Sequence, residues 1–481
     1  MNQPDKSRLS ALLAATAIFA AWGSPHLAQA QDAVEPTKRP SIAIESVVVV
    51  DVVRGETVGP RTVLIVDGRI AAIGVPGTID IPSAAARVDG RGRYLMPGLV
   101  DMHVHLFNNA SRRAPNEWAF PLFVANGVTA VREMRTEPAQ MTVVEGWRAK
   151  VDRGELIAPS VVAAGMAAGA GTVEATRRQV REAKAAGADF VKIFSEVREP
   201  QWRAILEEAR ALQMPVCGHI PGEVSLLDGA TAGQRSNEHL TQVYEACSVR
   251  EKQWLGARTG LDGPKIVELR DAQEQEVLES FDPLVCDRIA AALARTDQVQ
   301  VPTLVLPYFE ARGSPTNFRD DPRWRYLRPD EQARWQRFLK VREHAVGVEK
   351  LAARRWEVSR QIVRTLQSAG VRILAGTDAP MPLVYPGYAL HKELELLVES
   401  GLSPADALRA ATIWPAEFLG VSDRSGSITV GKRADLLLLD ANPLSDIRHT
   451  QRIRAVVLAG RLLPRADLDA LLAAAVDSQA R

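Results

Sequence analysis

Cysteine is scarce in this sequence, with three residues in 481. Three cysteines are too few for a disulfide framework, so the fold depends on a hydrophobic core. Cys247 and Cys286 lie in the same charged segment, and an oxidising compartment would allow them to pair. The sequence leaves this pairing open and slightly favours free thiols. Cys217 lies within a strand pattern, which predicts a core position.

An excess of charge of either sign is also missing. Lysine and arginine total 59 and aspartate and glutamate 58, which gives a net charge of +1. This balance argues against nucleic-acid binding, which needs a basic excess or a basic face. Apolar residues make up 46%, as in ordinary globular proteins. The composition favours a small neutral or mixed-charge substrate and leaves a homo-oligomer open.

Long apolar runs are absent after the N-terminus, so we expect no membrane span. Lys6 and Arg8 precede an apolar run over 9–22, and the small residues Ala28-Gln29-Ala30 follow it. This order is typical of a secretory signal peptide. We therefore expect a signal peptide at 1–30, a leader at 31–40, and export to the periplasm or the medium.

Residues 41–97 and 426–465 read as short strands at the two ends of the chain. The dipeptide Asp67-Gly68 between two apolar runs indicates a hairpin. Neither half has enough apolar surface for a core of its own. We therefore expect both halves to pair into one small β-sandwich domain.

Residues 98–425 alternate between apolar strands and helical segments, which predicts an α/β fold with parallel strands. Eight strands are expected: Leu99–Leu106, Val128–Met134, Ser160–Ala164, Phe190–Phe194, Pro215–Ile220, Ser236–Leu240, Val299–Val305 and Val371–Asp378. Eight such repeats match the TIM-like (β/α)8 barrel, whose chemistry lies at the C-terminal ends of the strands. The alternative, a doubly wound nucleotide-binding sheet, carries a Gly-rich phosphate turn that is missing here.

Two charged segments, 245–298 and 309–362, interrupt the barrel pattern. Loops after barrel strands often form lids and pockets. A solvated helical decoration is an equal alternative for both segments.

The first barrel strand contains two histidines separated by one residue, His103 and His105. Alternate residues of a strand face the same side, so both imidazoles can point into the barrel and bind one divalent ion. The fourth strand carries Lys192 among apolar residues. Burial favours its neutral amine, which can react with carbon dioxide to form an anionic carbamate. A lysine that reaches the strand end or an ion pair is the alternative.

Three further polar residues lie at strand ends: His219, His239 and Asp378. A single histidine in a strand is more often a core residue than a ligand. Two on consecutive strands, together with the residues above, favour a metal site. A buried aspartate also needs a cationic partner, which a metal would provide.

Several of these stretches resemble the amidohydrolase superfamily. The run from Leu95 to His105 looks like its opening motif, 127–132 resembles its second strand, and Gly426-Ser427-Ile428 with 431–436 resembles its return into the small domain. The stretch 187–194 resembles the carboxylated-lysine motif of the binuclear subgroup, which includes imidazolonepropionase-like and prolidase-like enzymes.

The resemblance implies a two-metal site. In it His103, His105 and Asp378 hold one ion, His219 and His239 hold the second, and carboxylated Lys192 bridges them. Such ligands suit Zn²⁺, with Mn²⁺, Co²⁺ or Fe²⁺ as alternatives. We expect a metal-bridging hydroxide to attack an amide carbonyl, with Asp378 as general base and then general acid.

The substrate is not fixed by the sequence, although a dipeptide or an N-acyl amino acid suits the resemblance. Many dipeptidase-like members carry Gly-Gly-His after the third strand, whereas 165–171 contains no histidine. The candidate substrate contacts are Arg135, Tyr244 and Tyr308, with surface pairing or packing as their alternatives.

Two other functions remain to be compared. A one-metal deaminase of the same superfamily would not need Lys192. A non-catalytic binding protein would be expected to lose some of the six ligand positions, all of which are present.

Overall fold

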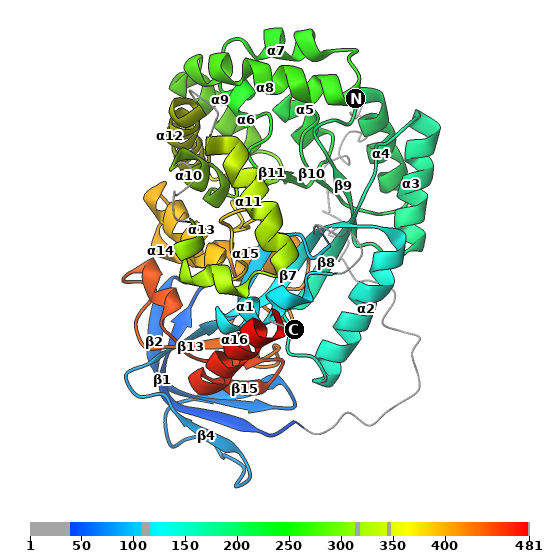
Figure 1. Cartoon of the computed structure of the whole chain (residues 1–481). Coiled ribbons are helices and arrows are strands. Elements are labelled where there is room, and N and C mark those ends of the chain that lie inside the picture. Colours follow the sequence, from blue (N-terminus) through cyan, green and yellow to red (C-terminus); the bar gives the residue numbers. More distant parts are fainter. Residues whose placement is uncertain (1–38, 108–114, 313–317, 344–347, 480–481) are drawn as a thin grey trace, which may run out of the picture.

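The computed structural model describes residues 39–107, 115–312, 318–343 and 348–479 (Figure 1). The expected signal peptide and most of the leader lie outside these residues. Within them, none of the helices combines the length and the apolar character needed to cross a membrane.

Seven parallel strands form the wall of the barrel, in the order β12-β11-β10-β9-β8-β7-β6. Their bounds are β6 Leu99–Val104, β7 Val128–Thr136, β8 Ser160–Ala167, β9 Phe190–Ile193, β10 Val216–Gly218, β11 Ser236–Glu238 and β12 Val299–Val301. Each begins within a residue or so of the expected strand. The seventh is shorter than expected because the chain turns into a helix at Val305.

The eighth barrel position is filled by residues 371–378, which form isolated bridges rather than a continuous strand. Ile373 bridges to Gln300 of β12, and the amide of Asp378 donates to the carbonyl of His103 in β6, at 2.7 Å. The buried carboxylate of Asp101 also accepts from the hydroxyl of Thr377, at 2.6 Å. The barrel is therefore nearly closed, with side-chain hydrogen bonds supplementing the last backbone ladder.

Helices cover the outside of the barrel and join its strands (Figure 1). They are α1 Phe120–Ala125, α2 Pro138–Arg153, α3 Val173–Ala185, α4 Glu199–Ala211, α5 Leu226–Thr231, α13 Tyr388–Glu399, α14 Pro404–Ala410, α15 Ile413–Phe418 and α16 Arg465–Gln479, with the 3-10 turns η2 Glu117–Ala119 and η5 Ile447–Gln451. Helices α3 and α4 are two of the helical segments that the alternation of residues 98–425 predicts between the strands. A threonine begins α3, since the Thr172 hydroxyl accepts the amide of Ala175.

The small domain is one eight-stranded mixed sheet built from both ends of the chain. Its strands are β1 Ile42–Asp51, β2 Glu56–Val66, β3 Arg69–Gly74, β4 Ala86–Asp89, β5 Tyr94–Pro97, β13 Leu436–Leu439, β14 Ile453–Leu458 and β15 Arg461–Pro464. The expected hairpin joins β2 to β3, and both Asp67 and Gly68 have the positive φ values that such a tight turn needs. Alternate residues of the sheet, such as Ile44, Val63 and Leu436, form a core separate from that of the barrel.

The two charged segments form helices above the barrel mouth (Figure 1). The first contains α6 Val243–Ala246, α7 Glu251–Arg258, α8 Gly263–Glu279 and α9 Pro283–Leu293, and the second contains α10 Val305–Ala311, η3 Phe318–Asp320, η4 Pro322–Tyr326, α11 Pro329–Glu343 and α12 Val348–Ser368.

The expectation of three free thiols is wrong. Cys247 and Cys286 form a disulfide, and only Cys217 is free, in the barrel core. The chain returns to itself at this point, because Ser248 bridges to Phe281 and the amide of Asp282 donates to the carbonyl of Cys247 at 2.9 Å. The disulfide therefore closes the base of a lobe that contains α7 and α8. We call residues 247–286 the α7–α8 lobe.

Candidate metal centre

Six side chains converge at the C-terminal ends of the barrel strands, and we call them the ligand cluster. The cluster consists of His103, His105, Lys192, His219, His239 and Asp378. The imidazole rings of His103 and His239 lie 4.5 Å apart, and those of His219 and His239 lie 5.0 Å apart, between centroids. The structure thus brings the sequence-expected ligands into one place.

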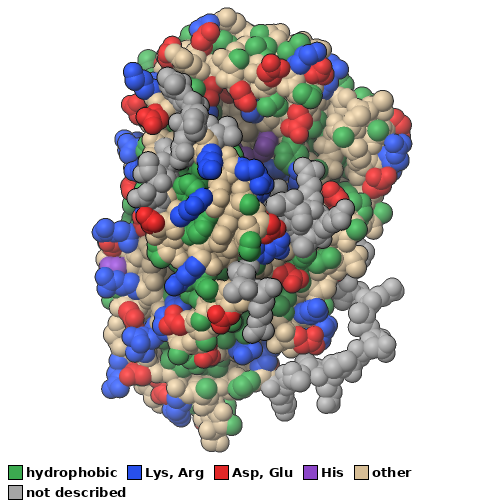
Figure 2. Space-filling model, viewed as in Figure 1, with side chains coloured by type: hydrophobic (Ala, Val, Ile, Leu, Met, Phe, Trp, Pro, Cys, Tyr) green, Lys and Arg blue, Asp and Glu red, His purple; other side chains and the backbone are tan. Residues whose placement is uncertain are grey.

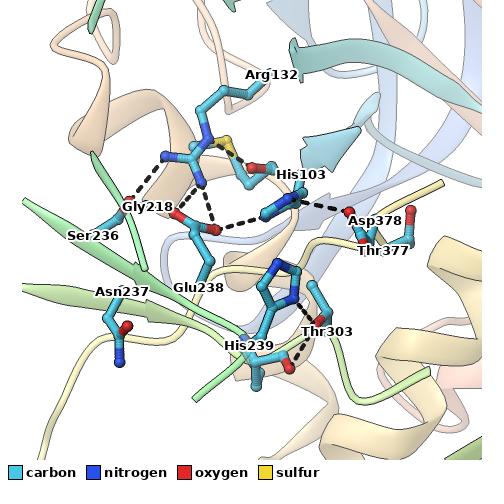
Figure 3. Close-up of polar contacts among 12 residues, drawn as sticks. His103, Arg132, Gly218, Ser236, Asn237, Glu238, His239, Thr303, Thr377 and Asp378 are labelled. Atoms are coloured by element: carbon cyan, nitrogen blue, oxygen red, sulfur yellow. Dashed lines mark hydrogen bonds and ion pairs between the residues drawn. The ribbon is translucent and has the colours of Figure 1, made fainter. Parts of the chain in front are cut away.

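Three members of the cluster meet closely enough to hold a single ion. Ligand atoms of His103, His105 and Asp378 all lie within 4.8 Å of one another. Oδ1 of Asp378 is 2.9 Å from Nε2 of His105. The same oxygen is 3.3 Å from Nε2 of His103 (Figure 3). The two imidazoles and the carboxylate are the N and O donors that Zn²⁺ and similar ions prefer.

His103 is oriented by a buried ion pair behind it. Its Nδ1 lies 2.8 Å from Oε2 of Glu238, and Nη2 of Arg132 lies 2.9 Å from Oε1 of the same carboxylate (Figure 3). All three side chains are fully buried. The carboxylate accepts the Nδ1 proton, which directs Nε2 of His103 at Oδ1 of Asp378. In the neutral ring this Nε2 carries the lone pair that would bind a cation.

Thr303 fixes the tautomer of His239 with the proton on Nδ1, as Glu238 does for His103. The Thr303 hydroxyl donates to the carbonyl of Pro302 at 2.8 Å, so its oxygen is left to accept from Nδ1 of His239, also at 2.8 Å. Nε2 of His239 therefore carries the free lone pair that a metal ligand needs. Nδ1 of His219 lies 3.0 Å from the hydroxyl of Ser195, which orients that ring.

Lys192 is fully buried at the end of β9 and faces the cluster. Its Nζ lies 5.2 Å from the centre of the Phe194 ring and has no hydrogen-bond partner in the described part of the chain. Gly218 allows this placement: it has a φ of +125°, and a Cβ there would lie 2.9 Å from Cδ of Lys192 and 2.3 Å from the carbonyl oxygen of Ile193. A buried amine with no partner is costly, so it indicates a missing group.

Burial sets the protonation of the cluster. It lowers the pKa of Lys192 to about 8 and that of His239 to about 3, and together with the charge of Lys192 it lowers the pKa of His219. Burial alone would raise the pKa of Asp378, but its contacts with His103 and His105 outweigh this and hold it well below the usual value. The centre thus offers neutral imidazoles at His219 and His239 and an ionised carboxylate at Asp378, the forms that bind cations.

The three expected substrate contacts, Tyr244, Arg135 and Tyr308, lie in three different parts of the structure. Tyr244 lines a cavity of about 530 Å³ that also exposes His219 and His239. Arg135 is exposed and lines a separate cavity, with its guanidinium 5.5 Å from the Phe194 ring centre. Tyr308 lies on α10 and packs against α12, with its ring centre 5.5 Å from that of Trp356 and 3.6 Å from the Arg312 guanidinium. Only Tyr244 is brought to the metal cavity.

Sequence reasoning missed the residues that hold the ligands. Glu238, Arg132, Thr303 and Ser195 each contact a ligand or its partner, and none was expected to. Glu133 is a further example, since it is fully buried with Oε1 4.0 Å from Nδ1 of His105. The acidic residue directly before His239 was a usable signal, because ligand histidines commonly donate their second proton to a carboxylate.

The comparisons with known proteins agree with the fold and the motifs. A model of the Amidohydrolase family matches residues 341–463. The chain is 31% identical over 215 residues to an adenine deaminase of Halalkalibacterium halodurans, which covers 42% of this chain and 36% of the relative. It is 27% identical over 452 residues to adenine deaminase 2 of Agrobacterium fabrum, which covers 91% of this chain and 60% of the relative. The chain thus spans less than two thirds of either relative.

Solved structures show the same architecture. A candidate prolidase from Bifidobacterium longum superposes with a TM-score of 0.62 at 26% identity, over 91% of this chain and all of the other. In its motif order, in the barrel with its two-ended sheet and in the family match over residues 341–463, this chain is similar to the amidohydrolases.

Proposed function

We propose that the protein is a binuclear metal-dependent hydrolase that cleaves the C–N bond of an amide, with a carboxylated Lys192 shared by two divalent cations. The observation that carries the proposal is the buried Lys192 amine, which lies without a hydrogen-bond partner in the described chain beside a group of histidines. Curated relatives that act on C–N bonds, such as imidazolonepropionase of Rubrobacter xylanophilus at 37% identity over 109 residues, support the reaction class.

Carboxylation would resolve the cost of burying this amine. The neutral amine of Lys192 forms an N–C bond to carbon dioxide and loses one proton to solvent. The side chain then ends in an anionic carbamate whose two oxygens can each bind a cation. A buried amine without a hydrogen-bond partner thus becomes an anion that two cations would neutralise, which is far less costly.

The roles of the residues follow from their places in the cluster. His103, His105 and Asp378 would hold one cation and His219 and His239 the other, with Zn²⁺ suited to these donors. When bound, two such cations lower the pKa of water and polarise a carbonyl oxygen. The carboxylate of Asp378 would take a proton from the attacking water and deliver it to the leaving nitrogen.

Metal counting combined with an amide screen tests the proposal. We expect two cations per chain and hydrolysis of N-acyl amino acids or dipeptides. A Lys192→Met variant, which keeps the length but removes the amine, is expected to bind at most one cation and to lose turnover. One cation in the active wild-type protein, with unaltered activity in Lys192→Met, would overturn it.

A one-metal deaminase is the second candidate. The match to two adenine deaminases supports it, and so does the close meeting of His103, His105 and Asp378. Release of ammonia from an aminopurine by protein with a single cation would favour this reading.

We also propose that the protein is exported. The disulfide between Cys247 and Cys286 supports this, because such bonds persist in oxidising compartments. Fractionation of the producing cells tests it, with the protein expected outside the cytoplasm.

A further inference from the structure

The cavity over the ligand cluster has one wall that the barrel does not supply. Its base includes His219 and His239, and its outer wall includes Arg270, Glu274 and Leu278 of α8. In Figure 2 a hollow opens in the upper half of the visible face, and a histidine side chain is seen at its base. A substrate that reaches the cluster through this cavity must pass the α7–α8 lobe.

A disulfide and several hydrogen bonds hold the α7–α8 lobe in place. The buried disulfide joins its two ends, and the hydroxyls of Ser248 and Ser280 lie 2.8 Å apart beside it. Asp262 caps the start of α8 by accepting the amide of Lys265 at 3.1 Å. These contacts fix the position of the side chains that α8 presents to the cavity.

Most charges of the cavity are already committed to ion pairs within the protein. Arg355 of α12 is held by two carboxylates: one of Glu274, and one of Glu310 at 2.6 Å. Glu245 pairs with the fully buried Arg258 at 3.0 Å. A ligand cannot take over these groups without breaking partly or fully buried pairs.

Arg270 differs from Arg355 in this respect. Its only ion-pair partner among the described residues is Asp271, the next residue in the chain, at 2.9 Å. The side chain of Asp271 is 64% exposed, and such a surface pair contributes little. The guanidinium of Arg270 can therefore exchange Asp271 for another carboxylate at small cost. Arg270 lines the same cavity as His219 and His239, so its guanidinium lies close to the cluster.

We propose that Arg270 binds a carboxylate of the substrate, and that the α7–α8 lobe thereby selects amides that carry a free carboxylate. A guanidinium offers the planar pair of donors that suits a carboxylate. Apolar residues of the same cavity, including Ile220, Val277 and Leu306, leave room for an apolar side chain beside that carboxylate. The substrate class is then an N-acyl amino acid or a small peptide with an apolar residue at the free end.

This inference rests on the proposed amide hydrolysis, but binding tests it independently of turnover. The probes are N-acetyl-L-leucine and its uncharged analogue N-acetyl-L-leucinamide, measured by calorimetry on the metal-loaded protein. We expect the acid to bind about tenfold to a hundredfold more tightly than the amide, as for a charge-assisted hydrogen-bonded pair. In Arg270→Gln this preference falls to about twofold or less, while binding of the amide is unchanged.

Matched variants complete the design. Lys265→Gln removes a cation from the same helix at a site where the side chain is 65% exposed, and it is expected to keep the full preference. Arg270→Lys retains the charge but not the paired donors. Its preference for the acid is therefore expected to lie between those of the wild-type protein and Arg270→Gln. A wild-type protein that binds neither probe, or binds both equally, overturns the proposal. So does an unchanged preference in Arg270→Gln.

Failure of the proposed function would instead appear as absence of amide hydrolysis, whichever probe binds.

Discussion

The ligand cluster and the wall of the cavity lie side by side, but they are stabilised in different ways. His103, His219 and His239 are each held by a partner at 2.8–3.0 Å. The wall is held by one disulfide and by ion pairs that reach the surface, such as Arg270 with the exposed Asp271. A buried network is intolerant of change, whereas partly exposed pairs can be rearranged. We therefore expect the cluster to determine the chemistry and the wall to determine the substrate.

The largest effect is expected from Arg132→Met. The substitution leaves the Glu238 carboxylate buried without its cation, which typically costs about 3–5 kcal/mol of unfolding free energy. It also releases His103, so metal content should fall. Urea denaturation and metal counting check both effects. The double variant Arg132→Met with Glu238→Gln is the control and should recover part of the stability. Unchanged stability in the single variant would contradict the account.

Asp378→Asn is expected to reduce turnover by about 10²- to 10⁴-fold, as for loss of a general acid–base group. The amide fills the same space, so the unfolding temperature should stay close to that of the wild type. Steady-state kinetics with metal-saturated protein measure the effect. A variant that keeps its cations and near-full turnover would remove Asp378 from the proton transfer.

Thr303→Val removes the oxygen that accepts from His239. Loss of such a supporting contact typically weakens metal affinity by about 10- to 100-fold, and here the second cation should be affected. Competition with a chelator measures the affinity, and nitrogen-15 NMR reports which ring nitrogen of His239 carries the proton. Thr303→Ser keeps the hydroxyl and should behave as the wild type. Equal affinities in all three proteins would refute the assignment.

Replacing Cys247 and Cys286 by serine tests the wall rather than the cluster. The α7–α8 lobe loses its closed base, so we expect KM to rise by roughly threefold to tenfold through local loosening. The metal content should not change, because no ligand belongs to the lobe. Loss of cations in this variant would show that the two regions are not separable.

The smallest effect concerns Glu393 of α13, which is fully buried beside Leu304 and Val305. Its buried carboxylate accepts the amides of Leu304 and Val305 at 2.9 and 2.8 Å, just after Thr303. Burial raises the pKa of Glu393 to about 8. A carboxyl that holds its proton more tightly in the folded chain stabilises it fully below about pH 4.5 and loses that effect as the pH rises through about 8.

Glu393→Gln removes this titration, so its unfolding temperature should decline less than that of the wild type between about pH 5 and about pH 8. Thermal denaturation over this range measures the difference. Glu399→Gln, at the exposed end of the same helix, is the control and should follow the wild type. Parallel curves for all three proteins would contradict a raised pKa at Glu393.

Strand periodicity predicted the barrel, and together with the family resemblance it predicted which side chains meet at the strand ends. His103, Lys192 and His219 lie on or directly after extended strands, where every second side chain faces inward. The residues that hold these side chains, such as Glu238 and Thr303, were not predictable from periodicity, because the backbone is irregular where the strands end. His239, Thr303 and Asp378 have φ values of +59°, +49° and +66°, so each strand end departs from alternation. This is why both Glu238 and its neighbour His239 contact the centre, which a regular strand does not allow.

The cavity wall was beyond sequence reasoning for a different reason. Arg270 looks like any surface arginine of a charged helix, and only the return of the chain between Cys247 and Cys286 places it over the cluster. Likewise Arg132 and Glu238 are 106 residues apart, and no local pattern links them. Contacts of this kind depend on tertiary placement.

The most direct test of the central claim is carbon-13 NMR of the metal-loaded protein supplied with labelled bicarbonate. The account predicts a carbamate signal in the wild-type protein that is absent from Lys192→Met, together with two cations per chain. An active enzyme that gives no such signal and holds one cation would contradict it.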